Sequence, residues 1–288
     1  MITRIKIRQL KDKGFFILIC LLMLLGAMPL VSILFELIRK GYKQLNIAFF
    51  TETAPSTLDA MLAMGTGDII PGGIANGIIG TLIMVSLASV VAIPLGIMIG
   101  IYLAEKPTAT FSNIVRFVAD LLQGVPSIVI GIIAYAWIVC TFKSYSALAG
   151  AFALSLMMAP LIIRSTEETL KMLPPSLKEA GLALGASYTS VVLKILLPAA
   201  FGGLFTGILL SISRVTGETA PIMLTALGSS MITVDVMRPM SAVPLLIWEF
   251  YNDPNLMNMI WSCSLFLLIM ILTLNIIAKF IAHRWKIQ

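Results

Sequence analysis

Long apolar runs alternate with short polar stretches along this chain, and the pattern predicts membrane-spanning helices. A helix needs about 20 apolar residues to cross the hydrocarbon core of a bilayer. Six runs reach that length, at residues 15–38, 74–104, 114–142, 145–163, 191–213 and 259–281. The run at 74–104 exceeds one bilayer, so we expect that helix to tilt or to extend past the membrane. The pattern predicts an all-α, polytopic membrane protein with six transmembrane helices and both chain ends on one side.

The connecting segments divide the chain into two regions. Short turns near residues 105–107 and 143–146 predict antiparallel neighbouring helices. Glycine and proline residues in the longer segment at 39–73 mark a return to the membrane. We therefore assign residues 1–73 to an N-terminal anchor helix with an external segment, and residues 74–283 to a transmembrane domain containing a polar loop at 164–190. A second long segment, 219–258, carries prolines among apolar residues, which favours interfacial or re-entrant helices.

Composition and charge agree with a membrane location and set the orientation. Hydrophobic residues make up 59% of the chain and charged residues only 12%, against roughly 25% charged residues in a soluble domain. Lysine and arginine concentrate on the cytoplasmic side of membrane proteins. In the predicted topology one side collects Arg4, Lys6, Arg8, Lys11, Lys13, Lys106, Arg116, Arg164, Lys171, Lys178, Lys194, Lys279, Arg284 and Lys286. Both termini and the 164–190 loop are thus predicted to be cytoplasmic. The net charge of +6 then has a topological origin, and no nucleic-acid partner is expected.

Catalytic chemistry has no support in the residues. Cys20, Cys140 and Cys263 lie far apart in apolar runs, and the single histidine, His283, lies in the basic tail. Neither a nucleophile–base set nor a phosphate-binding GxxxxGK[ST] loop occurs in the sequence. We expect a non-catalytic chain with no metal site and no cofactor of its own. If ATP drives this protein, a separate subunit must bind ATP and Mg²⁺ and hydrolyse the nucleotide.

The polar segment at 176–198 is unusual in so apolar a chain. Ser176 and Glu179 have the spacing of a capping box, Pro174 and Pro175 precede them, and Gly185 can end a helix in the left-handed conformation. This predicts a short helix at about 177–184. On the cytoplasmic side, such a helix is a candidate docking surface for another protein.

Charged residues inside the fifth run are the strongest candidates for a substrate pathway, because charge in a membrane is costly. On a helix with about 100° per residue, Gly203, Gly207, Arg214 and Glu218 share one face. Small residues on this face predict close contact with protein. The planar Arg214 guanidinium suits an oxyanion, and Glu218 could accept a hydrogen bond from a protonated phosphate. We assign Thr219 to the same pathway. The alternative role of Arg214 and Glu218 is an i,i+4 ion pair that only neutralises a buried charge.

A second polar stripe occurs in the third run. Its members repeat at three- and four-residue spacing and are Asp120, Gln123, Gly124, Ser127 and Gly131. We expect the stripe to face the interior and assign Gln123 and Ser127 to the pathway. Asp120 would repel an anion, so we expect it to pair with a cation. Pro126 predicts a kink, either for gating or purely structural. Arg164 is either a positive-inside anchor or a group that receives an exiting anion.

Three stretches resemble a known family, the permeases of ATP-binding-cassette (ABC) phosphate importers of the Pst type, and within it the PstA-like subunits. They are GVPSIVIGI at 124–132, PLIIRSTEETLKMLPPSLKEAGLALGAS at 160–187 and TGILLSISRVTGETAPIMLTA at 206–226. The 176–198 segment is similar to the EAA loop of such permeases. The resemblance implies that Glu179, Ala180, Gly181, Leu184 and Gly185 dock on an ATPase, although the family usually has alanine where Gly181 stands.

The resemblance implies a type I ABC importer with a MetI-like permease core in a bacterial or archaeal cell membrane. Implied partners are a second permease subunit, two ATPase subunits, an extracytoplasmic phosphate-binding protein, phosphate and membrane lipid. The expected function is that of a permease subunit for inorganic phosphate, with alternating access driven through the docking helix. The alternatives are a permease for another oxyanion or small solute, the sister subunit, a stand-alone secondary transporter, and an added role in signalling phosphate supply.

Overall fold

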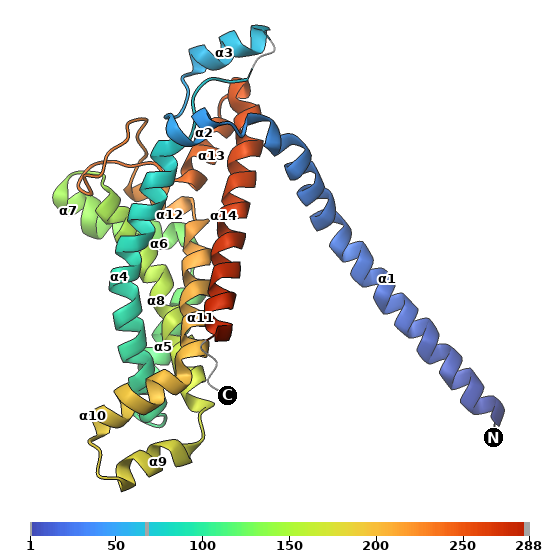
Figure 1. Cartoon of the computed structure of the whole chain (residues 1–288), viewed down its shortest axis with the longest axis vertical. Coiled ribbons are helices and arrows are strands. Elements are labelled where there is room, and N and C mark those ends of the chain that lie inside the picture. Colours follow the sequence, from blue (N-terminus) through green and yellow to red (C-terminus); the bar gives the residue numbers. More distant parts are fainter. Residues whose placement is uncertain (1, 67–68, 285–288) are drawn as a thin grey trace.

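The computed structural model describes residues 2–66 and 69–284, and within these ranges the chain is almost entirely helical (Figure 1). The only β-type pairing there is an isolated bridge between Leu227 and Met240. Five helical segments are long and apolar enough to cross a membrane, and a sharply bent helix pair makes a sixth if it counts as one span. The prediction of an all-α chain is confirmed, but one of the six spans is broken.

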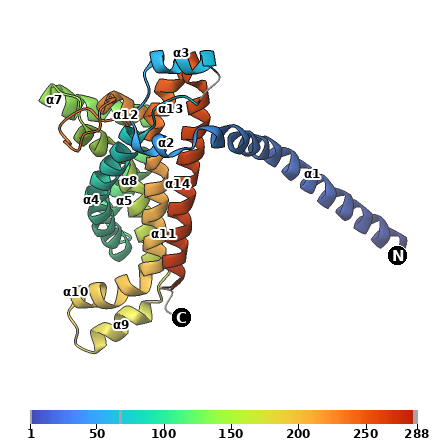
Figure 2. The same ribbon diagram turned by 45° about the horizontal axis from the view of Figure 1, so that its top comes forward.

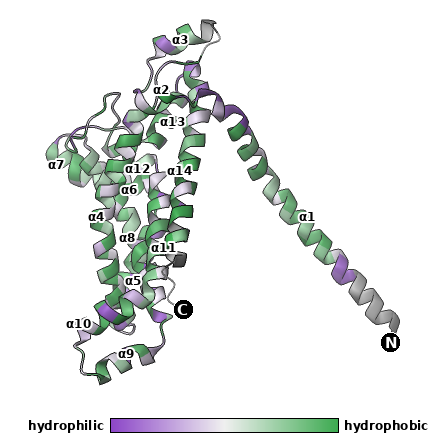
Figure 3. Ribbon diagram, viewed as in Figure 1, coloured by the Kyte–Doolittle hydropathy of each residue, from purple (hydrophilic) through white to green (hydrophobic). Residues whose placement is uncertain are grey.

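The first helix, α1 (Ile2–Gly41), extends away from the rest of the molecule (Figures 1 and 2). Its apolar middle, shown in green in Figure 3, has no protein cover within this chain. Only its end meets the long C-terminal helix α14 (Met257–Arg284), where the Ser262 hydroxyl donates a hydrogen bond of 2.7 Å to the Gly41 carbonyl. A Cβ on Gly41 would lie 2.7 Å from the Trp261 carbonyl oxygen. Glycine thus permits this close crossing.

The centre of the molecule is the pair α4 (Ala75–Glu105) and α8 (Ala147–Lys171). Glycines bring the two backbones together: a Cβ on Gly96 would lie 2.6 Å from Ile162 Cγ2, and one on Gly100 2.5 Å from Thr166 Cβ. Close approach of this kind increases the van der Waals contact that stabilises helix pairs in lipid. α8 is the most enclosed of the candidate spans, with two thirds of its apolar window buried.

The third predicted span, 114–142, is not one helix. It consists of α5 (Thr110–Gly124) and a second arm made of α6 (Ser127–Ala134), a π-helical turn at Tyr135–Val139 and α7 (Cys140–Phe142). The helix axis bends by 108° between the two arms. Val125 and Pro126 between them are extended, with ψ of 133° and 137°. Proline lacks a backbone N–H and disfavours helix in the residue before it, so the break falls at Pro126.

The chain after α8 makes an excursion and then returns along the bundle. A short turn leads from α8 to α9 (Pro175–Ala183), then to α10 (Tyr188–Val191), a π-helical turn (Val192–Leu196) and α11 (Leu197–Thr216). α11 packs between α8 and α14. α12 (Ala220–Thr225) follows it and contacts α6 and α8. In Figure 1, α9 and α10 lie at the same end of the molecule as the start of α1 and the end of α14.

Short helices cover the opposite end. They are η1 (Tyr42–Gln44), α2 (Ile47–Thr51), α3 (Thr57–Thr66), α13 (Val243–Tyr251) and η4 (Pro254–Leu256). Phe49, Ile74, Leu246, Phe250 and Met259 form a common apolar cluster beneath them. The segment at 219–258 contains the short helices α12 and α13, and buried residues of both pack in the apolar core. Its predicted interfacial or re-entrant placement stays a prediction.

Candidate functional site

Arg214 and Glu218 lie together where α11 ends. The Nε of Arg214 is 3.8 Å from Glu218 Oε1, an ion pair too long for a hydrogen bond. α11 ends at Thr216, so Glu218 lies just beyond the helix, in the turn before α12. The prediction that Glu218 belongs to the face of this helix that carries Gly203 and Gly207 is therefore wrong. The Arg214 side chain is 45% exposed, and no hydrogen bond to another described residue is seen for it. Its planar set of N–H donors therefore remains largely available to an oxyanion.

The small residues of α11 pack against protein, as predicted. A Cβ added to Gly207 would overlap the Ser165 hydroxyl of α8, and one on Gly203 would overlap the Thr169 side chain. The Ser211 hydroxyl, also buried, donates 2.8 Å to the Gly207 carbonyl. This face of α11 therefore lies directly on α8, about two turns before Arg214.

Three other predicted pathway residues lie at two helix breaks, one between α5 and α6 and the other between α11 and α12. Gln123, half-buried, is in the last turn of α5, Ser127 begins α6, and Thr219 precedes α12. A Cβ on Gly131 of α6 would lie 2.8 Å from Pro221 Cα of α12, so these two short helices are in close contact. The expectation that Asp120 to Gly131 form one stripe on one helix face is wrong, because the 108° bend separates α5 from α6.

Arg164 and Asp120 form a two-point ion pair between α8 and α5. The Nε of Arg164 donates 2.9 Å to Asp120 Oδ1, and Nη2 donates 2.7 Å and 2.5 Å to the two carboxylate oxygens. The predicted pairing of Asp120 with a cation is thereby observed. Arg164 also reaches Glu167 through Nη1, at 3.3 Å. Its donors are occupied, in contrast to those of Arg214.

Glu167 is the residue that sequence reasoning missed. Its side chain is 1% exposed and meets three cations: Arg116 Nε at 2.7 Å, Lys171 Nζ at 2.5 Å and Arg164 at 3.3 Å. The spacing Arg164–Glu167–Lys171 is i, i+3, i+7, which brings all three onto one helix face. That spacing was visible in the sequence; the approach of Arg116 from α5 was not.

Arg116 fastens a third helix to this cluster. Its Nη1 donates 2.8 Å to the Pro107 carbonyl, and its Nη2 donates 3.1 Å to the Leu103 carbonyl at the end of α4. The last carbonyls of a helix lack intrahelical partners, so the guanidinium satisfies one of them. Arg116 and Glu167 together join the ends of α4, α5 and α8.

The helix α9 forms at the predicted place, but it starts differently. It begins at Pro175, two residues early, and no side chain caps it, so the Ser176–Glu179 capping box is wrong. Proline fits the first helical turn because the missing N–H would have no intrahelical partner. The predicted end is observed: Gly185 has φ of +77°, and the N–H groups of Gly185 and Ala186 donate to the carbonyls of Leu182 and Gly181.

One face of α9 is packed and the other is open. Gly181 is buried, and a Cβ there would lie 2.8 Å from Ile195 Cδ1 and 3.0 Å from Val191 Cγ2. That close packing accounts for glycine where the resembling loops usually have alanine. Glu179, Ala180 and Gly185 are exposed, and Leu184 is 89% exposed. Leu184 thus leaves an apolar side chain open to contact with another protein.

A charged link connects α9 to α4. Lys178 forms a close ion pair with Glu105, the last residue of α4, and its Nζ lies 5.4 Å from the centre of the Tyr188 ring. Lys178 is thus held between α4 and the start of α10. The pair therefore joins α9 to the end of α4.

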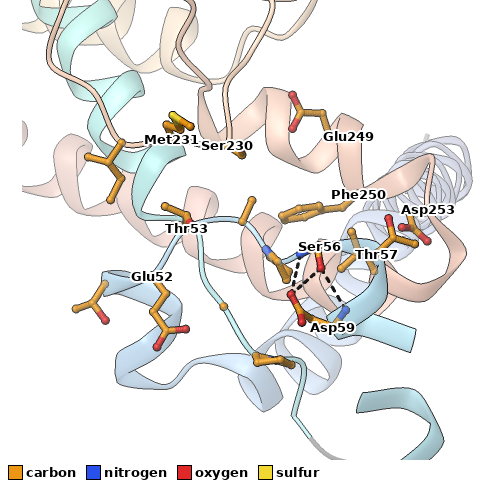
Figure 4. A pocket seen from close by; sticks show the side chains of 17 residues that line it. Glu52, Thr53, Ser56, Thr57, Asp59, Ser230, Met231, Glu249, Phe250 and Asp253 are labelled. Carbon is orange, nitrogen blue, oxygen red and sulfur yellow. Dashed lines mark hydrogen bonds between the residues drawn. The ribbon is translucent and has the colours of Figure 1, made fainter. Parts of the chain in front are cut away.

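A cavity of about 1260 Å³ lies at the opposite end of the molecule (Figure 4). Its lining includes the carboxylates Glu52, Asp59, Glu249 and Asp253 and no lysine or arginine. Hydrogen bonds from the Thr57 hydroxyl and the Asn255 backbone N–H lower the pKa of Asp253. A negatively charged lining disfavours an anion, so this cavity is a poor phosphate site.

Fold and site define a helical membrane protein of the permease class: a bundle with polar residues at helix breaks and an exposed polar helix at one end. The chain belongs to the family described as "Binding-protein-dependent transport system inner membrane component", whose pattern matches residues 96–287. The transport subunits of this family work in the membrane, and this chain is a non-catalytic transport component with several spans.

Curated relatives cover nearly the whole chain. The phosphate transport system permease protein PstA of Yersinia pestis is 37% identical over 97% of this chain and 92% of its own length. PstA of Pasteurella multocida is 36% identical over 96% of both chains. The probable PstA of Methanocaldococcus jannaschii is 32% identical over 93% of this chain and 92% of its own.

A solved structure supports the fold. A chain of the inward-facing MetNI methionine ABC transporter matches with a TM-score of 0.58 at 20% identity, covering 72% of this chain and 91% of that one. A second crystal form of the same transporter gives a TM-score of 0.54. The MetI-like permease architecture is thus confirmed.

Proposed function

We infer that this chain is a permease subunit of an ATP-driven, binding-protein-dependent importer of inorganic phosphate. The observation that carries the inference is Arg214, a half-exposed guanidinium at a helix end within an apolar bundle, loosely paired with Glu218 at 3.8 Å. A charged side chain in a membrane is costly, so its presence there marks a candidate functional site. A fork of free N–H donors binds the oxygens of a phosphate group, and the PstA relatives are named for phosphate transport.

Residues at the two helix breaks would complete the pathway. Thr219, Ser127 and Gln123 carry uncharged polar groups that can exchange hydrogen bonds with a passing anion without holding it strongly. Glu218 would accept a hydrogen bond from a protonated phosphate oxygen, which sulfate does not offer at neutral pH. Selectivity would follow from that difference.

The α9 end of the molecule is assigned to the cytoplasm. The positive-inside pattern supports this orientation, which places both termini and α9 on the same side. Glu179, Ala180, Leu184 and Gly185 would contact an ATPase subunit, while Gly181 holds α9 on the bundle. ATPase closure would move α9, and the Lys178–Glu105 link would carry that motion to α4.

The remaining parts are supplied by other chains. The transporter would need a second permease subunit, two ATPase subunits that bind ATP and Mg²⁺, and an extracytoplasmic phosphate-binding protein on the end opposite α9. A multi-pass location in a bacterial or archaeal cell membrane, surrounded by lipid, fits these partners. No cofactor would be bound by this chain.

The test is uptake of radiolabelled phosphate by the complete reconstituted complex. Arg214→Ala should abolish uptake, and Glu218→Gln should lower it and weaken discrimination against sulfate. Arg238→Ala, which removes an exposed arginine paired with Asp235, serves as the control. Unchanged phosphate uptake in both pathway variants would rule out this role, and uptake that molybdate or sulfate suppresses as strongly as phosphate would indicate a different oxyanion.

A further inference from the structure

Arg164 has two carboxylate partners that differ sharply in their surroundings. Glu167 is 1% exposed and is shared with Arg116 at 2.7 Å and Lys171 at 2.5 Å, so it contacts Arg164 only at 3.3 Å. Asp120 is 54% exposed and takes the Nε and Nη2 edge of the guanidinium. Glu167 is locked in place by burial, whereas about half of the Asp120 side chain is uncovered by this chain. An ion pair with one exposed partner costs less to separate than one that is buried on both sides.

Asp120 can leave without moving a helix. Arg116 lies on the same helix as Asp120, and its bond to Glu167 keeps α5 attached to α8. A side-chain rotation is therefore enough to free the Arg164 fork. A crevice of about 420 Å³ borders Asp120 and is otherwise lined by Phe117, Leu121, Gly124, Val125 and Pro126, so the Asp120 side chain has room to rotate away from Arg164.

The net charge of this cluster favours the replacement of Asp120 by an oxyanion. Arg116, Arg164 and Lys171 bring three positive charges, and Glu167 neutralises one of them. Without Asp120 the cluster has a net charge of +2, which equals the charge of hydrogen phosphate with opposite sign. The edge of Arg164 that Asp120 occupies is the same two-donor edge that binds phosphate oxygens.

We propose that Asp120 is the exchangeable counter-ion of Arg164: an oxyanion takes its place on the guanidinium during transport, and the returning carboxylate displaces the oxyanion. Asp120 is then a release group at the α9 end of the pathway. The proposal rests on the phosphate permease function inferred above. A tethered carboxylate competes at a high effective concentration, so phosphate already present on the exit side should hardly slow the intact protein.

The test uses proteoliposomes containing the complete transporter, with ATP inside, binding protein and radiolabelled phosphate outside, and graded unlabelled phosphate inside. For Asp120→Asn we expect inhibition at about fivefold lower internal phosphate than in the wild type, the factor that corresponds to about 1 kcal/mol. The maximal uptake rate should fall, and half-saturation by external phosphate should not change. Asp120→Glu should restore the wild-type response.

Glu168→Gln is the matched control, since Glu168 is an exposed carboxylate of α8 for which no ion pair is seen among the described residues. It should behave as wild type. Equal internal inhibition of wild type and Asp120→Asn would overturn the proposal. A uniform loss of uptake together with lower thermal stability would also overturn it, as would failure of both Asp120→Asn and Asp120→Ser to assemble. Either result would mean that the Asp120–Arg164 ion pair has only a structural role. A wild-type complex that moves no phosphate would instead refute the proposed function.

Discussion

Replacing Glu167 by glutamine tests the cluster that joins α4, α5 and α8. The change keeps the shape of the side chain and removes its charge. Of its three cations, Arg164 keeps Asp120, and Lys171 is 45% exposed and can turn to water. Arg116, 17% exposed, would lose the one ionic partner seen for it among the described residues. Removing one member of a buried pair costs about 3–5 kcal/mol; with one of three cations strongly affected, we expect about 2–3 kcal/mol.

Thermal unfolding of the purified protein in detergent measures this cost. A loss of 2–3 kcal/mol corresponds to a fall in Tm of roughly 5 °C for a chain of this size. Glu168→Gln, one residue along the same helix, should shift Tm by less than about 1 °C, since surface substitutions are nearly neutral. The double variant Glu167→Gln/Arg116→Met should regain part of the loss, because it removes the unpaired charge as well.

The reasoning would be refuted by a Glu167→Gln protein with the wild-type Tm. A fall in Tm that the double variant does not reduce would also count against it, because the two side chains would then contribute independently. Either result would mean that the ends of α4, α5 and α8 are held by apolar packing alone.

Three further predictions concern glycines and the open face of α9. Gly207→Ala should lower Tm by several degrees, because the new Cβ overlaps Ser165 and over-packing costs about 1–3 kcal/mol; Gly124→Ala, with open space around it, is the control, and equal Tm values would contradict the close packing. Gly185→Ala should speed hydrogen exchange of the last turn of α9, since φ of +77° costs an L-residue about 1 kcal/mol; unchanged exchange would show that the turn adapts. Leu184→Asp should leave Tm unchanged yet abolish co-purification of the ATPase subunits, and normal co-purification would exclude that docking surface.

The apolar runs determined the spans because a bilayer accepts only long apolar helices. Five predicted runs match helices to within a few residues at most ends, and α9 and its Gly185 end were predictable from local turn chemistry. The fold class, the family and the candidate pair Arg214 and Glu218 were also accessible from the sequence. These properties depend on residues close together along the chain.

Contacts between distant segments needed the tertiary structure. Pro126 predicted a kink in the helix. The size of the bend, 108°, depends on the packing of α6 against α12, which lies far away in the sequence. The absent capping box shows that a local motif does not form when proline can start the helix two residues earlier. Glu167 meets Arg116 from 51 residues away, and no spacing rule reaches that far. The sequence by itself thus determined which segments enter the membrane; packing of those segments decided which charges meet, because ion pairing between helices depends on their relative position in space.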